Sequence, residues 1–114
     1  MQSLKKQIEH FAKERDWEKY HSPKNLAMGL NIEAAELLEI FLWLTEEESH
    51  NLPEPKLAEL KEEIGDIMIY LTNLANKFNL DPIECAKQKI ELNKTKYPSE
   101  LVKGSAKKYT EYNK

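Results

Sequence analysis

The sequence predicts an all-α fold, a four-helix bundle followed by a C-terminal tail. Apolar residues recur at helical spacing in four segments, short connectors with proline separate these segments, and none shows the alternation typical of a strand. A length of 114 residues suits one domain, so we expect residues 1–114 to form a single domain with a tail from about residue 97.

The first two helices are each predicted from a start signal and an apolar stripe. Ser3 can cap a helix that runs to about Tyr20. Ser22-Pro23 then starts a second helix that runs to about Glu47, because serine is favoured at the N-cap and proline at the first helical position. The apolar positions are Leu4, Ile8, Phe11 and Ala12 in the first helix, and Leu26, Leu30, Leu37, Phe41 and Leu44 in the second.

The next two helices follow prolines. The segment from Asn51 to Pro55 breaks the helical pattern, and a third helix runs from near Pro55 to about Lys77. Asp81-Pro82 starts a fourth helix that ends at about Lys96, before Tyr97-Pro98. The third stripe consists of Leu57, Leu60, Ile64, Ile67, Leu71, Leu74 and Phe78, and we expect the second and third helices to form the centre of the bundle.

Composition excludes several classes of protein. No run of about 18 apolar residues could span a membrane, and the N-terminus lacks the apolar core of a signal peptide, so we expect a cytoplasmic protein. Cys85 is the single cysteine, and neither GxGxxG nor GxxxxGK[ST] occurs. A net charge of −3 argues against nonspecific binding of nucleic acid.

Charge is unevenly distributed along the chain. Residues 30–66 contain eleven acids and two lysines, whereas residues 87–114 contain eight lysines and three glutamates. An acidic centre with a basic C-terminal part suits a cation together with a polyanion, and it also suits ordinary solvated helix faces.

Two pairs of carboxylates occupy unexpected positions. Glu33 lies three residues after Leu30 and four before Leu37, so it points into the apolar stripe of the second helix, with Glu36 beside it. Glu63 and Asp66 lie at the edge of the stripe on the third helix. Burying unpaired carboxylates against a partner helix costs several kcal/mol of folding free energy. A neutralising group must offset this cost.

A hard divalent cation is the simplest neutralising group. Four carboxylates from two antiparallel helices could hold Mg²⁺ or Mn²⁺ and leave positions for water and phosphate oxygens. The alternative is that these acids lie on a solvated face. A ferritin-type di-iron site needs two Glu-x-x-His motifs on facing helices, whereas Glu18-x-x-His21 lies at a helix end, so the sequence favours magnesium-type chemistry.

Glu33-x-x-Glu36, followed after 26 residues by Glu63-x-x-Asp66, resembles the signature of the MazG-like superfamily of all-α nucleoside triphosphate pyrophosphohydrolases. The flanking sequences resemble the dCTP pyrophosphatase branch of that superfamily, and the resemblance extends from about Phe11 to Thr110. These flanks are residues 14–17, 20–26, 41–43, 66–71, 93–98 and 103–110.

The resemblance implies Mg²⁺-dependent hydrolysis of dCTP or a related nucleotide to the monophosphate and pyrophosphate, in the service of nucleotide-pool sanitation. It implies Glu33, Glu36, Glu63 and Asp66 as metal ligands. It also implies a nucleotide site formed by Trp17, Glu18, Lys19, Tyr20, His21, Trp43 and Tyr70, with Lys89, Asn93 and Tyr97 near the phosphates or sugar. Ile8 departs from the branch, which often has a histidine at this position, and this departure puts selectivity for cytosine in question.

The residues themselves suit this chemistry. Only metal ions can join a triphosphate to four carboxylates, by bridging the oxygens of both. Glu36 and Glu39 are both candidates for the base that takes a proton from the attacking water. The tryptophans offer flat faces on which a base can stack.

Assembly and two alternative functions complete the expectations. Apolar residues outside the main stripes, such as Met28, Leu38, Leu42 and Ile69, predict self-association. The resemblance implies a homodimer or homotetramer. The alternatives are the same fold with a broad nucleotide preference, and a non-catalytic metal-binding helical bundle.

Overall fold

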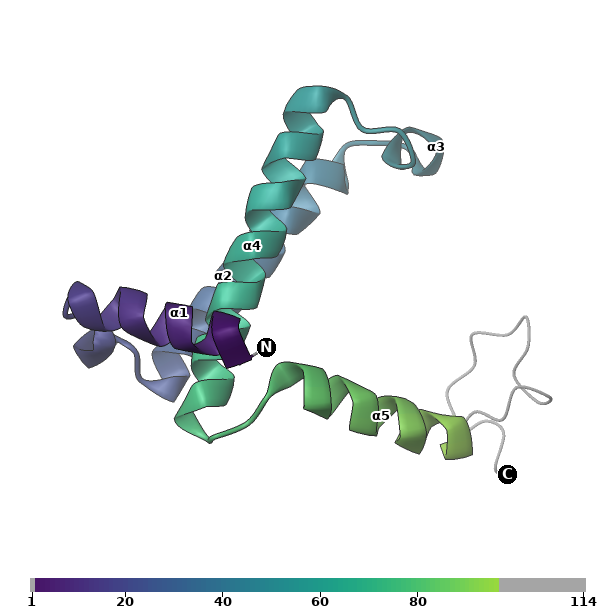
Figure 1. The fold of residues 1–114 in the computed structure, drawn as a ribbon. Coiled ribbons are helices and arrows are strands. Elements are labelled where there is room, and N and C mark those ends of the chain that lie inside the picture. Colours follow the sequence, from purple (N-terminus) through teal and green to yellow (C-terminus); the bar gives the residue numbers. More distant parts are fainter. Residues whose placement is uncertain (1, 97–114) are drawn as a thin grey trace. The chain divides into compact units, whose positions relative to one another are not determined.

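The computed structural model describes residues 2–96, and within this range the protein is entirely helical, with five α-helices and no strand (Figure 1). The helices are α1 (Gln2–Glu14), α2 (Pro23–Leu42), α3 (Glu46–Ser49), α4 (Glu54–Lys77) and α5 (Pro82–Lys96), and a 3-10 turn, η1, covers Glu18–Tyr20. The chain divides after Asp81 into two compact units, of which the first contains α1 to α4 and the second contains α5.

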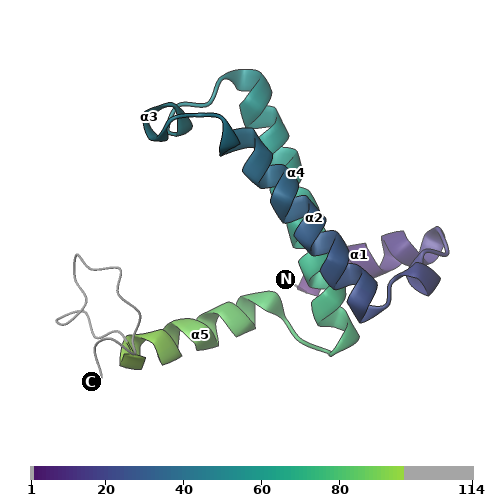
Figure 2. The same ribbon diagram turned by 180° about the vertical axis from the view of Figure 1, so that it is seen from behind.

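The first unit is built around a pair of long helices. Helices α2 and α4 lie side by side and run in opposite directions, as Figures 1 and 2 show from two sides. Helix α1 packs against α4. The expected central pairing of the two long helices is therefore confirmed.

The helix starts follow their local signals. The side chain of Ser22 accepts a hydrogen bond from the backbone N–H of Asn25 at 3.1 Å, and Pro23 is the first residue of α2. Helix α5 begins at Pro82, as Asp81-Pro82 predicts. Thr45 and Glu48 form a capping box that starts α3, with reciprocal hydrogen bonds of 2.8 and 3.1 Å.

Two predicted helix ends were wrong, and the helix count of four was wrong with them. The first helix ends at Glu14 instead of Tyr20, because Asp16 adopts a left-handed conformation with φ 54°. The N–H of Trp17 then bonds the carbonyl of Ala12 at 3.0 Å, which closes the helix end. The second helix ends at Leu42, and α3 is a separate helix because its capping box at Thr45 starts a new one.

The core of the first unit lies where its helices meet. Leu26 is 1% exposed and Thr72 is fully buried, and Ile8, Ala12 and Ile40 are buried as well. Two residues of the predicted third stripe behave differently, since Ile64 is half exposed and Phe78 follows the last residue of α4.

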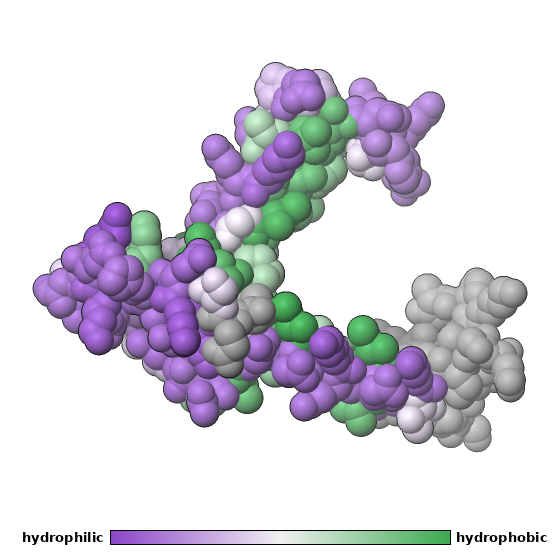
Figure 3. Space-filling model, viewed as in Figure 1, coloured by the Kyte–Doolittle hydropathy of each residue, from purple (hydrophilic) through white to green (hydrophobic). Residues whose placement is uncertain are grey.

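Helix α2 carries a second apolar face. Met28, Ile32, Leu38 and Leu42 are each more than half exposed and lie, by helical spacing, on the side of α2 opposite Leu26. Figure 3 shows apolar surface running along the arm formed by α2 and α4. None of the helices in residues 2–96 is both long and apolar enough to cross a membrane.

Candidate metal and nucleotide site

Three carboxylates converge where α2 packs against α4. Glu33 and Glu36 come from α2 and Glu63 comes from α4, and each offers one oxygen such that these oxygens lie within 4.8 Å of one another. Glu33 and Glu63 are half-buried, whereas Glu36 is exposed. The position of Glu33 in the apolar stripe explains this arrangement, because the stripe turns its side chain toward α4.

The cluster holds more negative charge than its surroundings can stabilise. A side-chain hydrogen bond with Glu63, reinforced by burial and by the charges of Glu36 and Asp66, raises the pKa of Glu33 to about 7. Among the described residues, the buried Oε2 atoms of Glu33 and Glu63 have no hydrogen-bond partner. The cluster therefore retains a proton or needs a cation.

The donor set fits a hard divalent cation. All three groups are carboxylate oxygens, which Mg²⁺ and Mn²⁺ prefer, and two of the oxygens are buried without a partner. The exposed side of the cluster at Glu36 leaves room for water and phosphate ligands. We conclude that Glu33, Glu36 and Glu63 are suited to hold such an ion.

Asp66 and Glu39 lie close to this cluster but outside it. Asp66 raises the pKa of Glu33 by its charge and lines a neighbouring cavity. Glu39 lines an acidic cavity of about 350 Å³ together with Glu36 and Glu63. Either Glu36 or Glu39 can therefore meet a water molecule near the cluster, and the choice of base stays open.

The neighbouring cavity is rich in aromatic residues and lies between α1, α4 and the segment that joins α1 to α2. It has a volume of about 450 Å³, and we call it the aromatic cavity. The rings of Phe11 and Trp17 meet edge to face at a centroid distance of 5.6 Å. The residues that line it are Leu4, Gln7, Ile8, Phe11, Ala12, Trp17, His21, Asp66, Ile69, Tyr70 and Asn73.

The aromatic cavity joins the predicted metal site to part of the predicted nucleotide site. Asp66, Tyr70 and Asn73 lie at spacings of four and three residues on α4, so they share one face of that helix with Glu63. Trp17 and His21 face them from the segment after α1. The cavity therefore combines aromatic and apolar walls with one carboxylate, Asp66.

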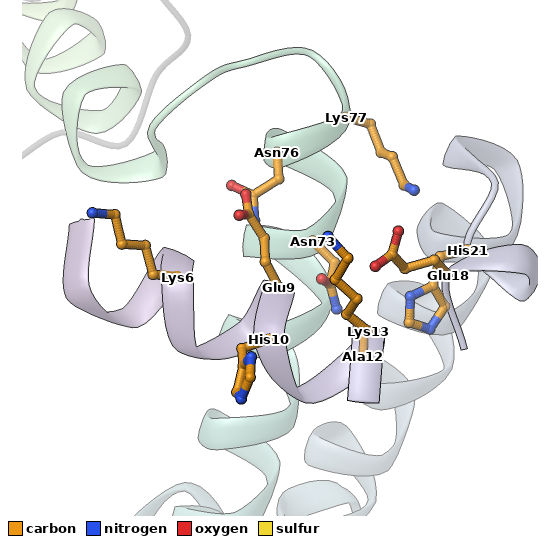
Figure 4. A pocket seen from close by; sticks show the side chains of 10 residues that line it. All are labelled: Lys6, Glu9, His10, Ala12, Lys13, Glu18, His21, Asn73, Asn76 and Lys77. Carbon is orange, nitrogen blue, oxygen red and sulfur yellow. The ribbon is translucent and has the colours of Figure 1, made fainter. Parts of the chain in front are cut away.

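A second cavity, the lysine-rich cavity, adjoins the aromatic one. It has a volume of about 650 Å³ and shares Ala12, His21 and Asn73 with the aromatic cavity. Figure 4 shows Asn73 and Asn76 on α4 opposite side chains of α1, with Glu18 and His21 on the adjoining segment. Lys6, Lys13 and Lys77 also line it.

Within the first unit, three of the predicted nucleotide residues, Lys19, Tyr20 and Trp43, do not line the aromatic cavity. Lys19 pairs with Asp16 at 3.1 Å and lies over the ring of Tyr20, which is 61% exposed. Trp43 caps the end of α2 and is 88% exposed. Lys89 and Asn93 lie on α5, which belongs to the second unit, and Tyr97 lies outside the described residues. Their roles stay predictions.

Several residues of these cavities were not predicted from the sequence. Phe11 belongs to the predicted apolar stripe of the first helix, yet its ring meets Trp17 edge to face and it is 49% exposed. Asn73 lies one helical turn beyond Tyr70 on the same face, but this spacing alone does not distinguish it from the other polar residues of α4. Gln7 gave no signal, because its position depends on how α1 packs against α4.

Comparison with known proteins identifies the family of this chain. Residues 28–112 match the model of the MazG-like family. The chain is 37% identical to dCTP pyrophosphatase 1 of Mus musculus over 113 residues and 37% identical to that of Homo sapiens over 117 residues. Each match covers 97% of this chain and 66% of the relative, so the chain spans slightly less than two thirds of these relatives.

A solved structure shows the same fold. The crystal structure of a pyrophosphatase from Archaeoglobus fulgidus superposes with a TM-score of 0.80 at 44% sequence identity, over 86% of this chain and 92% of that one. The resemblance seen in the paired carboxylate motifs and their flanks is thereby confirmed, and the chain belongs to the MazG-like family.

Proposed function

We propose that this protein is a Mg²⁺-dependent nucleotide pyrophosphohydrolase that converts dCTP or a related deoxynucleotide to the monophosphate and pyrophosphate. The carboxylate cluster beside the aromatic cavity carries the proposal, because it combines a cation site with an enclosure for a flat base. Similarity to proteins named dCTP pyrophosphatase 1 supports the choice of substrate. Such an activity would remove unwanted nucleotides from the pool.

The metal ligands in this proposal are Glu33, Glu36, Glu63 and Asp66. A bound Mg²⁺ would offset the charge of the triphosphate and of the departing pyrophosphate. Through that cation the carboxylates would hold the phosphates near α2 and α4, and a protonated Glu33 would have to lose its proton when the cation binds. Mn²⁺ has the same ligand preference and could replace Mg²⁺.

The reaction is the attack of water on a phosphorus atom in line with the departing group. A new P–O bond forms, the bridging P–O bond breaks, and pyrophosphate leaves with the electron pair of that bond. Glu36 or Glu39 accepts the proton of the water, since both lie at the exposed side of the cluster. Trp17, His21 and Tyr70 enclose the base, so the reacting phosphorus is held beside Asp66.

We also propose that the protein acts as a homodimer or homotetramer. The exposed apolar face of α2 supports this, because isolated chains rarely leave such a face in water. Assembly would let residues such as Trp43, Lys89, Asn93 and Tyr97, as well as Glu18, Lys19 and Tyr20, complete a site formed with another chain.

The test is pyrophosphate release from the common ribo- and deoxynucleoside triphosphates, with Mg²⁺ and with EDTA, for the wild type and Glu63→Gln. We expect Mg²⁺-dependent turnover with dCTP among the substrates, and a fall of at least about a hundredfold in Glu63→Gln. Helix content by circular dichroism should be retained, because the substituted amide keeps the shape of the side chain.

Glu47→Gln is the matched control, since it removes one negative charge from the exposed helix α3, away from the cluster. It should leave turnover unchanged. Full activity of Glu63→Gln would contradict the metal assignment. Similar turnover of every nucleotide would favour the broad-specificity alternative. Mg²⁺ binding without any turnover would favour a non-catalytic metal-binding bundle.

A further inference from the structure

Asn73 lies at the end of the aromatic cavity that is farthest along α4 from the carboxylate cluster. Asp66 and Asn73 are seven residues apart on one face of the helix, which corresponds to two turns and a rise of roughly 10 Å. A nucleotide whose phosphates lie at the cluster extends along this face by the length of its sugar and base. The hydrogen-bonding edge of the base then comes to lie beside Asn73, an argument that rests on the function proposed above.

The side chain of Asn73 is available for a ligand. It is half-buried and lines the aromatic cavity, and within residues 2–96 its amide has no hydrogen-bond partner. By contrast, Gln7, the other amide of this cavity, donates to Ser3 at 3.3 Å. The amide of Asn73 is therefore open to the cavity, where its donor and its acceptor can both meet a ligand.

We propose that Asn73 is a specificity-determining residue that hydrogen-bonds the edge of a pyrimidine base, and that it lets this site accept both cytosine and uracil deoxynucleotides. A side-chain amide has a donor and an acceptor side by side, and a rotation by 180° exchanges them. Cytosine presents a donor at its 4-amino group and an acceptor at N3. Uracil presents the reverse order, an acceptor at O4 and a donor at N3.

The other residues that line the cavity do not require one particular order of donor and acceptor on the base edge. Trp17 and Tyr70 offer ring surfaces that stack on any pyrimidine, and Ile8 has neither donor nor acceptor. His21 can donate or accept, depending on its tautomer. If the unpartnered amide of Asn73 supplies the contact with the base edge, the cavity discriminates only weakly between cytosine and uracil.

The experiment measures kcat/KM for dCTP and dUTP on the wild type, Asn73→Leu and Asn76→Leu, all with Mg²⁺. For the wild type we expect the two values to lie within about tenfold of each other. Asn73→Leu should lower both by roughly 10- to 100-fold, because each base loses its edge partner. Asn76→Leu makes the same change one turn further along α4. The amide of Asn76 is also without a partner, but its atoms are buried and the residue lines only the lysine-rich cavity, so this variant should change neither value.

Two results would overturn the proposal: a wild-type preference for dCTP above about a hundredfold, or Asn73→Leu with both values unchanged. Absence of turnover for every nucleotide would instead contradict the proposed function. In that case, binding of dCMP and dUMP, followed by tryptophan fluorescence, decides the role of Asn73. If Asn73→Leu binds both nucleotides more weakly than the wild type does, the role of Asn73 is supported. If the wild type and the variant bind them equally, or if neither binds them, that role is rejected.

Discussion

At the scale of single residues, the paired carboxylates are the part of the site that sequence could predict. Glu33 stood out because a charge in an apolar stripe is costly, and the structure places it against Glu63 with one buried oxygen of each lacking a partner. Asn73 could not be singled out in the same way, since a polar residue on a helix is ordinary until its neighbours are known.

The raised pKa of Glu33 predicts how pH affects the metal-free protein. The pKa is about 7 in the folded chain and 4.5 as its ordinary value, so the folded state holds more protons between these values. The free energy of unfolding contributed by this group therefore falls as pH rises through that window, and is largest below about pH 4.5.

The affinity for a cation should instead rise with pH, because the ion must displace the proton of Glu33. We expect Mg²⁺ to raise Tm more at about pH 8 than at about pH 5.5, as measured by thermal unfolding with Mg²⁺ and with EDTA. The Glu33→Gln variant should lose most of this difference. Equal Mg²⁺ shifts at both pH values in the wild type would show that Glu33 holds no displaceable proton.

At the scale of helices, local chemistry predicted the starts better than the ends. Ser22-Pro23 and Asp81-Pro82 act within a few residues, so their helices begin as expected. The ends of α1 and α4 use left-handed Asp16 and Asn79, where glycine is the usual signal, and the first was missed for that reason. The capping box Thr45-x-x-Glu48 is a start signal of the same local kind, and it begins the short helix α3.

Two glycines on the facing helices α2 and α4 make a matched prediction about packing. A Cβ at Gly29 would stand within 3 Å of the ring of Tyr70, whereas a Cβ at Gly65 would meet nothing within 4 Å. Gly29→Ala should lower the free energy of unfolding by roughly 1–3 kcal/mol and weaken nucleotide binding, because the Tyr70 ring forms a wall of the aromatic cavity.

Gly65→Ala is the corresponding control, since it adds the same methyl group to an open helix surface. It should raise the free energy of unfolding by about 0.5–1 kcal/mol through helix propensity. Both variants are compared by urea unfolding. Stabilisation by Gly29→Ala would mean that the tyrosine ring does not pack against α2 in solution.

At the scale of the whole molecule, the sequence predicted an all-α fold and the structure confirms it for residues 2–96. What could not be predicted is which apolar faces remain uncovered. The stripe facing α4 contains Leu26 and Ile40, which are buried, while the opposite face of α2 is as apolar and stays exposed. Helical spacing gives the two faces, but only packing shows which one is covered.

This uncovered face predicts assembly of the full chain. Each large apolar side chain buried there contributes about 1.5–3 kcal/mol, so several are enough to hold chains together. We expect light scattering after size exclusion to give a multiple of 13.4 kDa. Leu38→Glu should shift the protein toward the monomer, whereas Leu80→Glu, a similarly exposed position outside the face, should not. A monomeric wild type, or equal effects of both variants, would show that the exposed apolar face of α2 is not an interface. That face would then be exposed to solvent in the functional protein.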